Sequence, residues 1–323
     1  MKKLIKLSLS TILFSNVLNA QNISYEIIKD NPKFFVHVKG GALYDSEFSP
    51  NNNRSAYFFQ GSVNLGERIT LSGEYLNAYK KWDRVKENAV NVVDKSLQNF
   101  TGRGTFFFQV KDQKEDTRVS LKMTSSRSGN YVITDETFIM APARTINKVG
   151  VTGSAGYYRN SFIDNHKRDT IFTILDANSN AVNSLNYGTT LSGMRFSAGL
   201  HVAITKNFII KAQNNQTGEY YGKKSVRNKT ELIAEALYMP VVGYNESLTA
   251  TVENGGGAYT ISEKPNIKNL GWRLLVDSYT TGPLGLGLRL EFGARPGFVY
   301  NIHSSGKLKN MYLAAGIFLV LNK

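Results

Sequence analysis

Cysteine is absent from this 323-residue sequence, and its absence excludes several kinds of chemistry at once. No disulfide framework, zinc–thiolate site or cysteine nucleophile can form. A lipoprotein is excluded as well, because its lipid is attached to a cysteine. Histidine is scarce, with four residues, and no two of them have the spacing of metal ligands. The sequence therefore predicts neither a cofactor nor a metal site.

Long hydrophobic runs are also missing. Downstream of the N-terminal segment no run of about 18 apolar residues occurs, so we expect no membrane-spanning helix. Hydrophobic residues make up 41% of the chain, and the mean hydropathy is −0.27. These values suit a soluble protein. They suit an outer-membrane barrel equally well, because only every second strand residue has to face lipid.

The first twenty residues have the pattern of a secretory signal peptide. Lys2, Lys3 and Lys6 form a positive segment, a mostly apolar stretch follows, and a cut after Ala20 fits. The alternative is an N-terminal amphipathic helix of a cytosolic protein. Removing the signal lowers the formal net charge from +14 to +11, because it carries three lysines and no acid. This basic balance favours anionic partners, but no nucleic-acid motif is present.

What the chain has in abundance is a two-residue alternation. From Leu284 to Ala294, apolar side chains occupy one parity, whereas glycines, Arg289 and Glu291 occupy the other. Successive side chains of a strand point to opposite faces, so this segment predicts a strand with one apolar and one polar face. Residues 193–204 alternate in the same way.

Along the whole chain this pattern predicts an all-β protein. We expect a single antiparallel transmembrane β-barrel over residues 34–323, of about 14 strands (range about 12–16), after a periplasmic lead-in over residues 21–33. The predicted connections include a tight turn at 65–68, a charged turn at 112–116, a long loop at 125–146 with an internal strand at 131–139, and a turn at 205–207.

Two features favour a barrel over a secreted β-sandwich or solenoid, which would also alternate. The polar parity is rich in glycine and in charges of both signs, which suits a polar lumen. Aromatic residues gather near predicted strand ends, where membrane barrels carry aromatic belts. The predicted belt residues are Tyr57, Tyr75, Trp82, Tyr157, Tyr238, Trp272 and Tyr300.

The signal ending Asn19-Ala20-Gln21-Asn22, a composition rich in Asn, Lys and Tyr, and alternating strands up to the C-terminus resemble the outer-membrane β-barrel proteins of the Bacteroidota. The resemblance covers the whole chain and includes no specific motif. It implies an outer-membrane location in a Gram-negative bacterium, contact with lipid and lipopolysaccharide, and, as for several such barrels, partner proteins in that membrane or the periplasm. The chain departs from the better-known barrel pattern in ending on Leu321-Asn322-Lys323 and not on an aromatic residue.

Charged residues on the polar parity are candidates for a lumen or selectivity lining: Lys39, Arg118, Lys122, Arg195, His201, Lys211, Arg273, Arg289, Glu291 and Arg295. In an open channel their cations would favour anions. The alternative is a closed barrel in which the same charges form structural ion pairs. A predicted basic loop carries Lys223, Lys224, Arg227 and Lys229, and it is a candidate contact for lipopolysaccharide or simply a solvated charge run.

One segment hints at catalysis. His303 and Ser305 share a predicted face, and Asn310 would lie opposite His303 across a tight turn. This Ser–His pair resembles that of outer-membrane phospholipase A, except that Gly306 stands where that family has asparagine. Ser-Ser-Gly-Lys is also ordinary turn composition. We therefore expect a polar hairpin tip and no enzyme.

Three functions remain from the sequence. The first is a passive channel or uptake porin for small, anionic or amphipathic solutes. The second is an accessory or structural barrel of a secretion, assembly or surface-attachment complex, which a filled lumen would favour. The remote third is a rim lipid hydrolase that uses His303 and Ser305.

Overall fold

The computed structural model describes residues 22–34, 36–48, 51–81, 89–90, 97–128, 131–164, 169–170, 174–175, 178, 186–240, 243–244, 248–250, 257–261, 267–281, 284–298, 301–302 and 311–322. Almost all of them lie in β-strands or in short turns between strands. In this part of the chain, no helix has the length and apolar character needed to cross a membrane. The predicted signal peptide over residues 1–20 lies outside the described residues.

The chain divides into two compact units. One, which we call the hairpin unit, comprises Met1–Lys33, Asp112–Ile146 and Lys206–Arg227; the other, the barrel unit, comprises Phe34–Lys111, Asn147–Thr205 and Asn228–Lys323. Two internal segments therefore cluster with the N-terminal strand, and the predicted division into a lead-in over residues 21–33 and a barrel over residues 34–323 stays a prediction. The predicted lead-in over residues 21–33 contains that strand, β1 (Ile23–Asp30).

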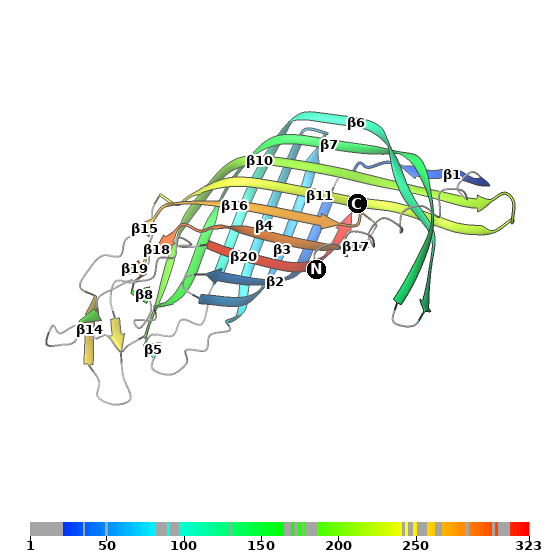
Figure 1. Ribbon diagram of the computed structural model, residues 1–323. Helices are drawn as coiled ribbons and strands as arrows, with labels where there is room; N and C mark the ends of the chain where they lie inside the picture. The colour runs from blue at the N-terminus through cyan, green and yellow to red at the C-terminus, as the bar shows by residue number, and fades with distance from the viewer. Residues whose placement is uncertain are drawn as a thin grey trace, which may run out of the picture. The chain divides into compact units, whose positions relative to one another are not determined.

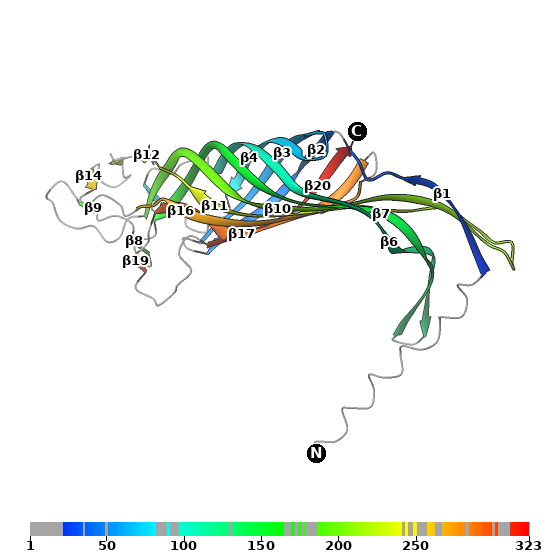
Figure 2. The same ribbon diagram turned by 90° about the horizontal axis from the view of Figure 1, so that it is seen from above.

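Ten strands of the described chain form a closed antiparallel ring (Figures 1 and 2). In ring order they are β10 (Asn186–Asn214), β11 (Tyr220–Tyr238), β16 (Leu270–Tyr279), β17 (Leu284–Ala294), β20 (Met311–Asn322), β2 (Val36–Phe48), β3 (Asn51–Leu65), β4 (Ile69–Lys81), β6 (Leu97–Ser128) and β7 (Tyr131–Asp164). Pairing of β7 with β10 closes the ring. Strand β1 pairs with β10 outside it.

The ring has fewer strands than the predicted 14 because several strands are very long. The predicted turn at 112–116 lies inside β6, which has 32 residues, and the predicted turn at 205–207 lies inside β10, which has 29. The predicted loop at 125–146 belongs mostly to β6 and β7. Neither false turn contains Gly or Pro, so polar composition alone suggested them. The predicted turn at 65–68 is confirmed, and Gly66 supplies its positive φ of 71°.

The barrel wall has the two faces that the alternation predicts. On β17, Leu284, Leu286, Leu288 and Leu290 are between 54% and 63% exposed, and the residues between them are buried. Inward glycines make room for large side chains: a Cβ at Gly287 would lie 2.4 Å from the ring of Phe318. The outer face is thus apolar, and the inner face is packed.

The two edges of the barrel unit differ. One edge carries the turn at 66–68 between β3 and β4 and the connection at 280–283 between β16 and β17. At the opposite edge the stretches of chain between ring strands are longer, as from β4 to β6 and from β11 to β16. We call these the short-turn edge and the long-loop edge.

The hairpin unit has a hydrophobic core of its own. It consists of Val119, Leu121, Ile139, Ala141, Ala143, Phe208, Ile210 and Ala212, with Ile23, Tyr221 and Val226 packed against it. On β10 the buried positions from Leu191 to Asn207 have odd numbers, and those from Phe208 onward have even numbers. The even-numbered, apolar side chains of β10 therefore point outward in the barrel unit and inward in the hairpin unit.

Short strands complete the described chain on the barrel unit. Strand β9 (Ile174–Leu175) pairs with β14 (Gly257–Ile261), which pairs with β13 (Leu248–Ala250). Strand β15 (Ile267–Lys268) pairs with β18 (Gly297–Phe298), and β8 (Asp169–Thr170) pairs with β19 (Asn301–Ile302). Strands β5 (Ala89–Val90) and β12 (Gly243–Tyr244) pair with β10.

Candidate functional site: the barrel interior

Charged side chains fill the interior of the barrel unit because the inward parity of most ring strands carries them. The buried or nearly buried cations are Lys39, Arg54, Arg103, Arg195, Lys229, Arg273, Arg289 and Arg295, and the carboxylates are Asp45, Glu47, Glu74, Glu231, Glu235, Asp277 and Glu291. Burial of a charge is tolerated only when the charge is paired and hydrogen-bonded. The contacts among these groups show how that condition is met.

The first cluster lies towards the short-turn edge and centres on Lys39. Its Nζ donates to Glu231 Oε2 at 2.7 Å and to Asp277 Oδ2 at 2.9 Å, and it lies 4.6 Å from the centroid of the Tyr279 ring. Glu231 also pairs with Lys229 at 2.8 Å. Three strands of the ring separate β2, which carries Lys39, from β11, which carries Glu231. The bond between them therefore crosses the lumen.

The second cluster centres on Arg289, which is 1% exposed. Its Nε and one terminal nitrogen donate to the two oxygens of Asp277, each at 2.8 Å. The other terminal nitrogen donates to Glu74 Oε2 at 2.7 Å on β4, and a further bond reaches Gln60 on β3. The guanidinium also stacks 4.0 Å from the Phe58 ring centroid. Because a planar guanidinium suits such multidentate pairing, lysine would not replace it.

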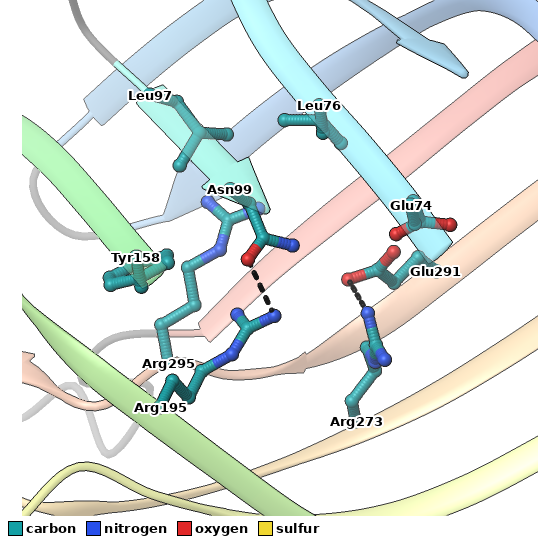
Figure 3. A pocket seen from close by; sticks show the side chains of 9 residues that line it. All are labelled: Glu74, Leu76, Leu97, Asn99, Tyr158, Arg195, Arg273, Glu291 and Arg295. Carbon is teal, nitrogen blue, oxygen red and sulfur yellow. Dashed lines mark hydrogen bonds and ion pairs between the residues drawn. The ribbon is translucent and has the colours of Figure 1, made fainter. Parts of the chain in front are cut away.

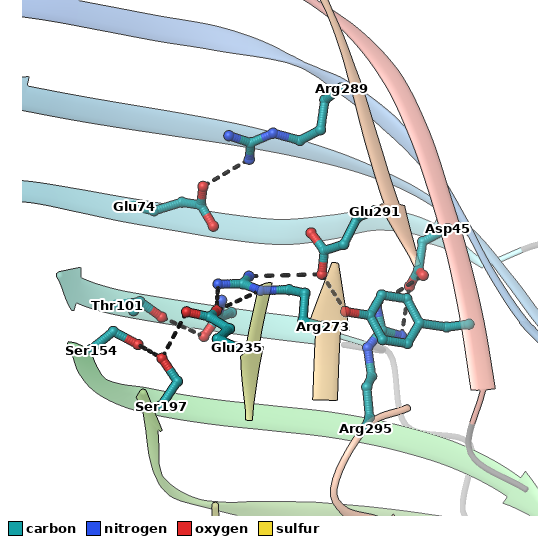
Figure 4. A network of polar contacts seen from close by, with 12 residues as sticks. Asp45, Glu74, Thr101, Ser154, Ser197, Glu235, Arg273, Arg289, Glu291 and Arg295 are labelled. Carbon is teal, nitrogen blue, oxygen red and sulfur yellow. Dashed lines mark hydrogen bonds and ion pairs between the residues drawn. The ribbon is translucent and has the colours of Figure 1, made fainter. Parts of the chain in front are cut away.

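A third cluster joins β6, β11, β16 and β17 through Glu235 (Figure 4). Arg273 donates to Glu235 Oε1 from Nε at 2.7 Å, and Arg103 approaches the same carboxylate at 3.2 Å. Ser197 donates to it at 2.9 Å. Glu291 accepts a hydrogen bond from the Tyr312 hydroxyl, and its Oε1 lies 3.7 Å from Nη1 of Arg273.

A fourth cluster lies towards the long-loop edge. Arg295 donates to Asp45 Oδ1 at 2.9 Å and to Glu47 Oε1 at 2.6 Å. Arg54 donates to Glu47 Oε2 at 2.5 Å and to Asn160 Oδ1 at 2.6 Å on β7. Together the four clusters join strands from all sides of the ring, and removing one member of such a buried pair typically costs about 3–5 kcal/mol.

A small cavity remains between the last two clusters (Figure 3). Its volume is about 20 Å³, which is enough for one water-sized species. Its lining residues are Glu74, Leu76, Leu97, Asn99, Tyr158, Arg195, Arg273, Glu291 and Arg295. The cavity is polar and rich in guanidinium groups.

The predicted lumen residues separate into two sets. Lys39, Arg195, His201, Arg273, Arg289, Glu291 and Arg295 are buried inside the barrel unit. Arg118, Lys122 and Lys211 belong to the hairpin unit, so the structure places them outside the lumen. Their strands were correctly recognised as alternating, but alternation does not reveal that a strand has left the barrel. Whether the buried set governs the passage of a solute stays a prediction.

Several interior residues were missed by the sequence analysis, namely Asp45, Glu47, Arg54, Glu74 and Arg103. A usable signal existed for most of them. Asp45 and Glu47 share the parity of Lys39 on β2, and Arg54 lies on the parity opposite the apolar Tyr57 and Phe59 on β3. Which carboxylates pair with these cations depends on register across strands, and this cannot be read from one strand alone.

The predicted basic loop is a strand. Lys223, Lys224, Arg227 and Lys229 all lie within β11, and Lys229 points into the barrel to Glu231. The charges do not interrupt the strand, whose residues up to Arg227 belong to the hairpin unit. A contact of the three remaining cations with lipopolysaccharide stays a prediction.

The predicted belt residues lie on the outer face where the structure describes them. Tyr75, Tyr157, Tyr238 and Trp272 are exposed, and Tyr57 is half-buried with its ring 6.3 Å from that of Tyr75. Four of these five, all except Tyr75, lie in the strand halves nearer the long-loop edge. Trp82 and Tyr300 lie outside the described residues, as do His303, Ser305 and Asn310 of the predicted hydrolase pair.

The hairpin unit carries exposed ion pairs. Lys122 pairs with Glu219 at 2.8 Å, and Arg144 pairs with Asp112. The hydrogen bonds from Arg144 hold the pKa of Asp112 below its usual value. This contribution to stability is present at neutral pH and is lost as the pH falls through the lowered pKa, but exposed pairs contribute little. In the part of the chain that the structure describes, no cluster of His, Asp and Glu could hold a metal ion.

No protein-family model matches this chain, and no curated protein matches it significantly. Among solved structures, the transport unit of the autotransporter AIDA-I from Escherichia coli aligns with a TM-score of 0.25 and 8% identity, over 97% of this chain and 94% of that one. The CymD monoaromatic hydrocarbon channel aligns with a TM-score of 0.23 and 9% identity, over 90% and 89% of the two chains. OmpT, an outer membrane protein of Vibrio cholerae, gives 0.19 and 8%, over 92% and 100%. Scores this low carry no argument, so the barrel rests on the strand pairing of this chain.

Proposed function

We propose that this protein is a non-conducting outer-membrane β-barrel that anchors the hairpin unit as an accessory or structural subunit of an envelope complex. The observation that carries the proposal is the filled lumen. Bonds such as Lys39–Glu231, Arg289–Glu74 and Arg103–Glu235 connect strands that are not neighbours in the ring. A small solute has no room to pass them without breaking buried ion pairs.

The outer face of the barrel unit supports the membrane location. Large apolar side chains such as Phe59, Phe100, Leu288, Ile317 and Leu319 are more than half exposed on it. Soluble monomers rarely expose contiguous apolar surface on this scale. A lipid-facing apolar band with charges confined to the inside is the pattern of outer-membrane barrels.

The two edges support an orientation. Outer-membrane barrels have short turns on the periplasmic side and longer loops on the extracellular side. The short-turn edge would then face the periplasm, and for the hairpin unit we propose a periplasmic location. The hairpin unit has its own core and an exposed surface, so it is the part of the chain that we propose contacts a periplasmic or outer-membrane protein. Lipid and lipopolysaccharide would surround the barrel.

The deciding experiment is single-channel recording of the refolded protein in a planar bilayer. We expect no steady current, although the protein shows the heat-modifiable gel mobility of a folded barrel. A matched variant, Arg103→Ala with Glu235→Ala, removes both members of a cross-lumen pair. It should conduct more than the native protein, which would show that the recording detects an opened lumen.

Steady open currents in the native protein would overturn the proposal. Anion-selective currents would instead support the passive uptake channel that the sequence also predicts. The rim hydrolase stays a prediction, because His303 and Ser305 lie outside the described residues. Unchanged lipase activity after Ser305→Ala would remove it.

A further inference from the structure

Arg195 differs from the other cations of the barrel interior. Every other cation named above has a carboxylate within 4.0 Å, whereas Arg195 has none in the part of the chain that the structure describes. Its guanidinium donates to Asn99 Oδ1 at 3.1 Å and to Thr101 Oγ1 at 3.5 Å, and it lies 5.1 Å from the Tyr158 ring centroid. Arg195 is only 7% exposed.

An unpaired buried guanidinium is costly. Arginine cannot escape the cost by losing its proton, because its pKa is too high. Amide and hydroxyl oxygens and one aromatic face solvate the charge in part, but they supply no net negative charge. Two carboxylates line the cavity, but neither serves as the counter-ion of Arg195. Glu74 is paired with Arg289, and Glu291 interacts with Tyr312 and Arg273.

Beside Arg195 lies the cavity of about 20 Å³, and a second unsatisfied group borders it (Figure 3). The hydroxyl of Tyr158 is buried and has no hydrogen-bond partner among the described residues. The side chain is 1% exposed. A buried hydroxyl without a partner typically costs about 1–3 kcal/mol, so a native protein usually satisfies it. An unpaired cation and an unpaired donor thus meet at one small space.

We propose that this cavity binds one monatomic inorganic anion of the halide class, with chloride as the physiological ligand. Arg195 supplies the compensating charge and N–H donors, and Tyr158 supplies an O–H donor. Arg273 and Arg295 add positive potential from the lining, although their own bonds go to carboxylates. The volume is enough for a water-sized ion. The bound anion stabilises the barrel interior.

The test uses the full chain in detergent and compares thermal unfolding in sodium chloride, sodium bromide and sodium gluconate at equal ionic strength. Native protein should melt several degrees higher in either halide than in gluconate, because a ligand that binds only the folded state stabilises it. Asn99→Asp is the sharpest variant. It places a carboxylate 3.1 Å from Arg195 without changing the size of the side chain, and it should abolish the halide dependence while the barrel still folds.

Tyr158→Phe tests the second donor, the Tyr158 hydroxyl. It keeps the ring and removes only the hydroxyl, so apparent halide affinity should fall about fivefold to tenfold. Crystals grown in bromide should show an anomalous peak between Arg195 and Tyr158 in the native protein and none in Asn99→Asp. Equal melting temperatures in halide and gluconate, or a water with no bromide signal, would overturn the proposal. Persistence of the full halide effect in Asn99→Asp would also overturn it.

Discussion

At the scale of single residues, the barrel interior is stabilised by charges whose partners lie on distant strands. Arg289 shows this most clearly, because it joins Asp277 on its neighbouring strand to Glu74 across the lumen. Such pairs are weak evidence for net stability when compared with an apolar core. They are nevertheless hard to alter singly, because the partner left behind would be a buried unpaired charge.

Replacing Arg289 by methionine should lower the free energy of unfolding by about 3–5 kcal/mol, since it leaves Asp277 and Glu74 without their main partner. Arg118→Met is the matched control, because Arg118 pairs with Glu136 on an exposed surface and should lose less than about 1 kcal/mol. Denaturant unfolding in detergent, followed by heat-modifiable gel mobility, measures both. Equal losses would contradict the structural role assigned to the interior pairs.

At the scale of one element, β10 serves two environments with one apolar parity. Phe196, Leu200 and Ile204 are exposed on the barrel wall, whereas Phe208 and Ile210 are fully buried in the hairpin unit. The change occurs where Asn207 and Phe208 are buried in succession. The strand therefore needs apolar residues throughout its length, first for lipid and then for a protein core.

Two asparagine substitutions on this strand should separate the two environments. Ile210→Asn should open the hairpin unit to proteolysis, at a cost of about 2–5 kcal/mol for the lost core packing, and should leave the heat-modifiable barrel intact. Leu200→Asn should lower the yield of barrel inserted into liposomes and leave the protease resistance of the hairpin unit unchanged. Limited proteolysis and flotation of liposomes report the two outcomes. Identical phenotypes would show that residue 210 does not belong to a separate core.

At the scale of the whole molecule, two hairpins build a second compact unit together with β1. Strands β6 and β7 supply one hairpin, and β10 and β11 supply the other. Because these strands are continuous with the barrel wall, the second unit needs no separate linker. The surface of this second unit is the one that the proposed accessory function would use.

The absence of cysteine makes the proposed orientation easy to test. A single cysteine at Gln216, in the exposed turn after β10, should react with a membrane-impermeant maleimide only after the outer membrane of intact cells is permeabilised. A cysteine at the exposed Lys268 position, towards the long-loop edge, should react on intact cells. Reversed labelling of the two variants would place the hairpin unit outside the cell and would exclude a periplasmic partner.

Much of the wall could be predicted from the sequence because alternation is a local property. The two faces of β17, the outward apolar parity of β10 on the barrel and the turn at Gly66 are all confirmed. The turn at 112–116 was wrong because Asp112, Lys114 and Asp116 are exposed within a strand, where charged side chains are as well solvated as in a turn. The cavity beside Arg195 could not be predicted. It depends on the register of β6, β7 and β10, which decides which of their residues lie at the same level along the barrel axis.

By itself, the sequence determined that the chain forms strands with an apolar face and a charged face, because side-chain direction follows residue number within any strand. It also determined that no thiol chemistry operates. Only the tertiary structure decided that the ring closes with ten strands, that four of them continue into a second core, and that the interior charges pair across the lumen. The physical reason is that an apolar residue facing lipid and one facing a protein core look the same in sequence, and that pairing of charges depends on register between strands far apart in the chain.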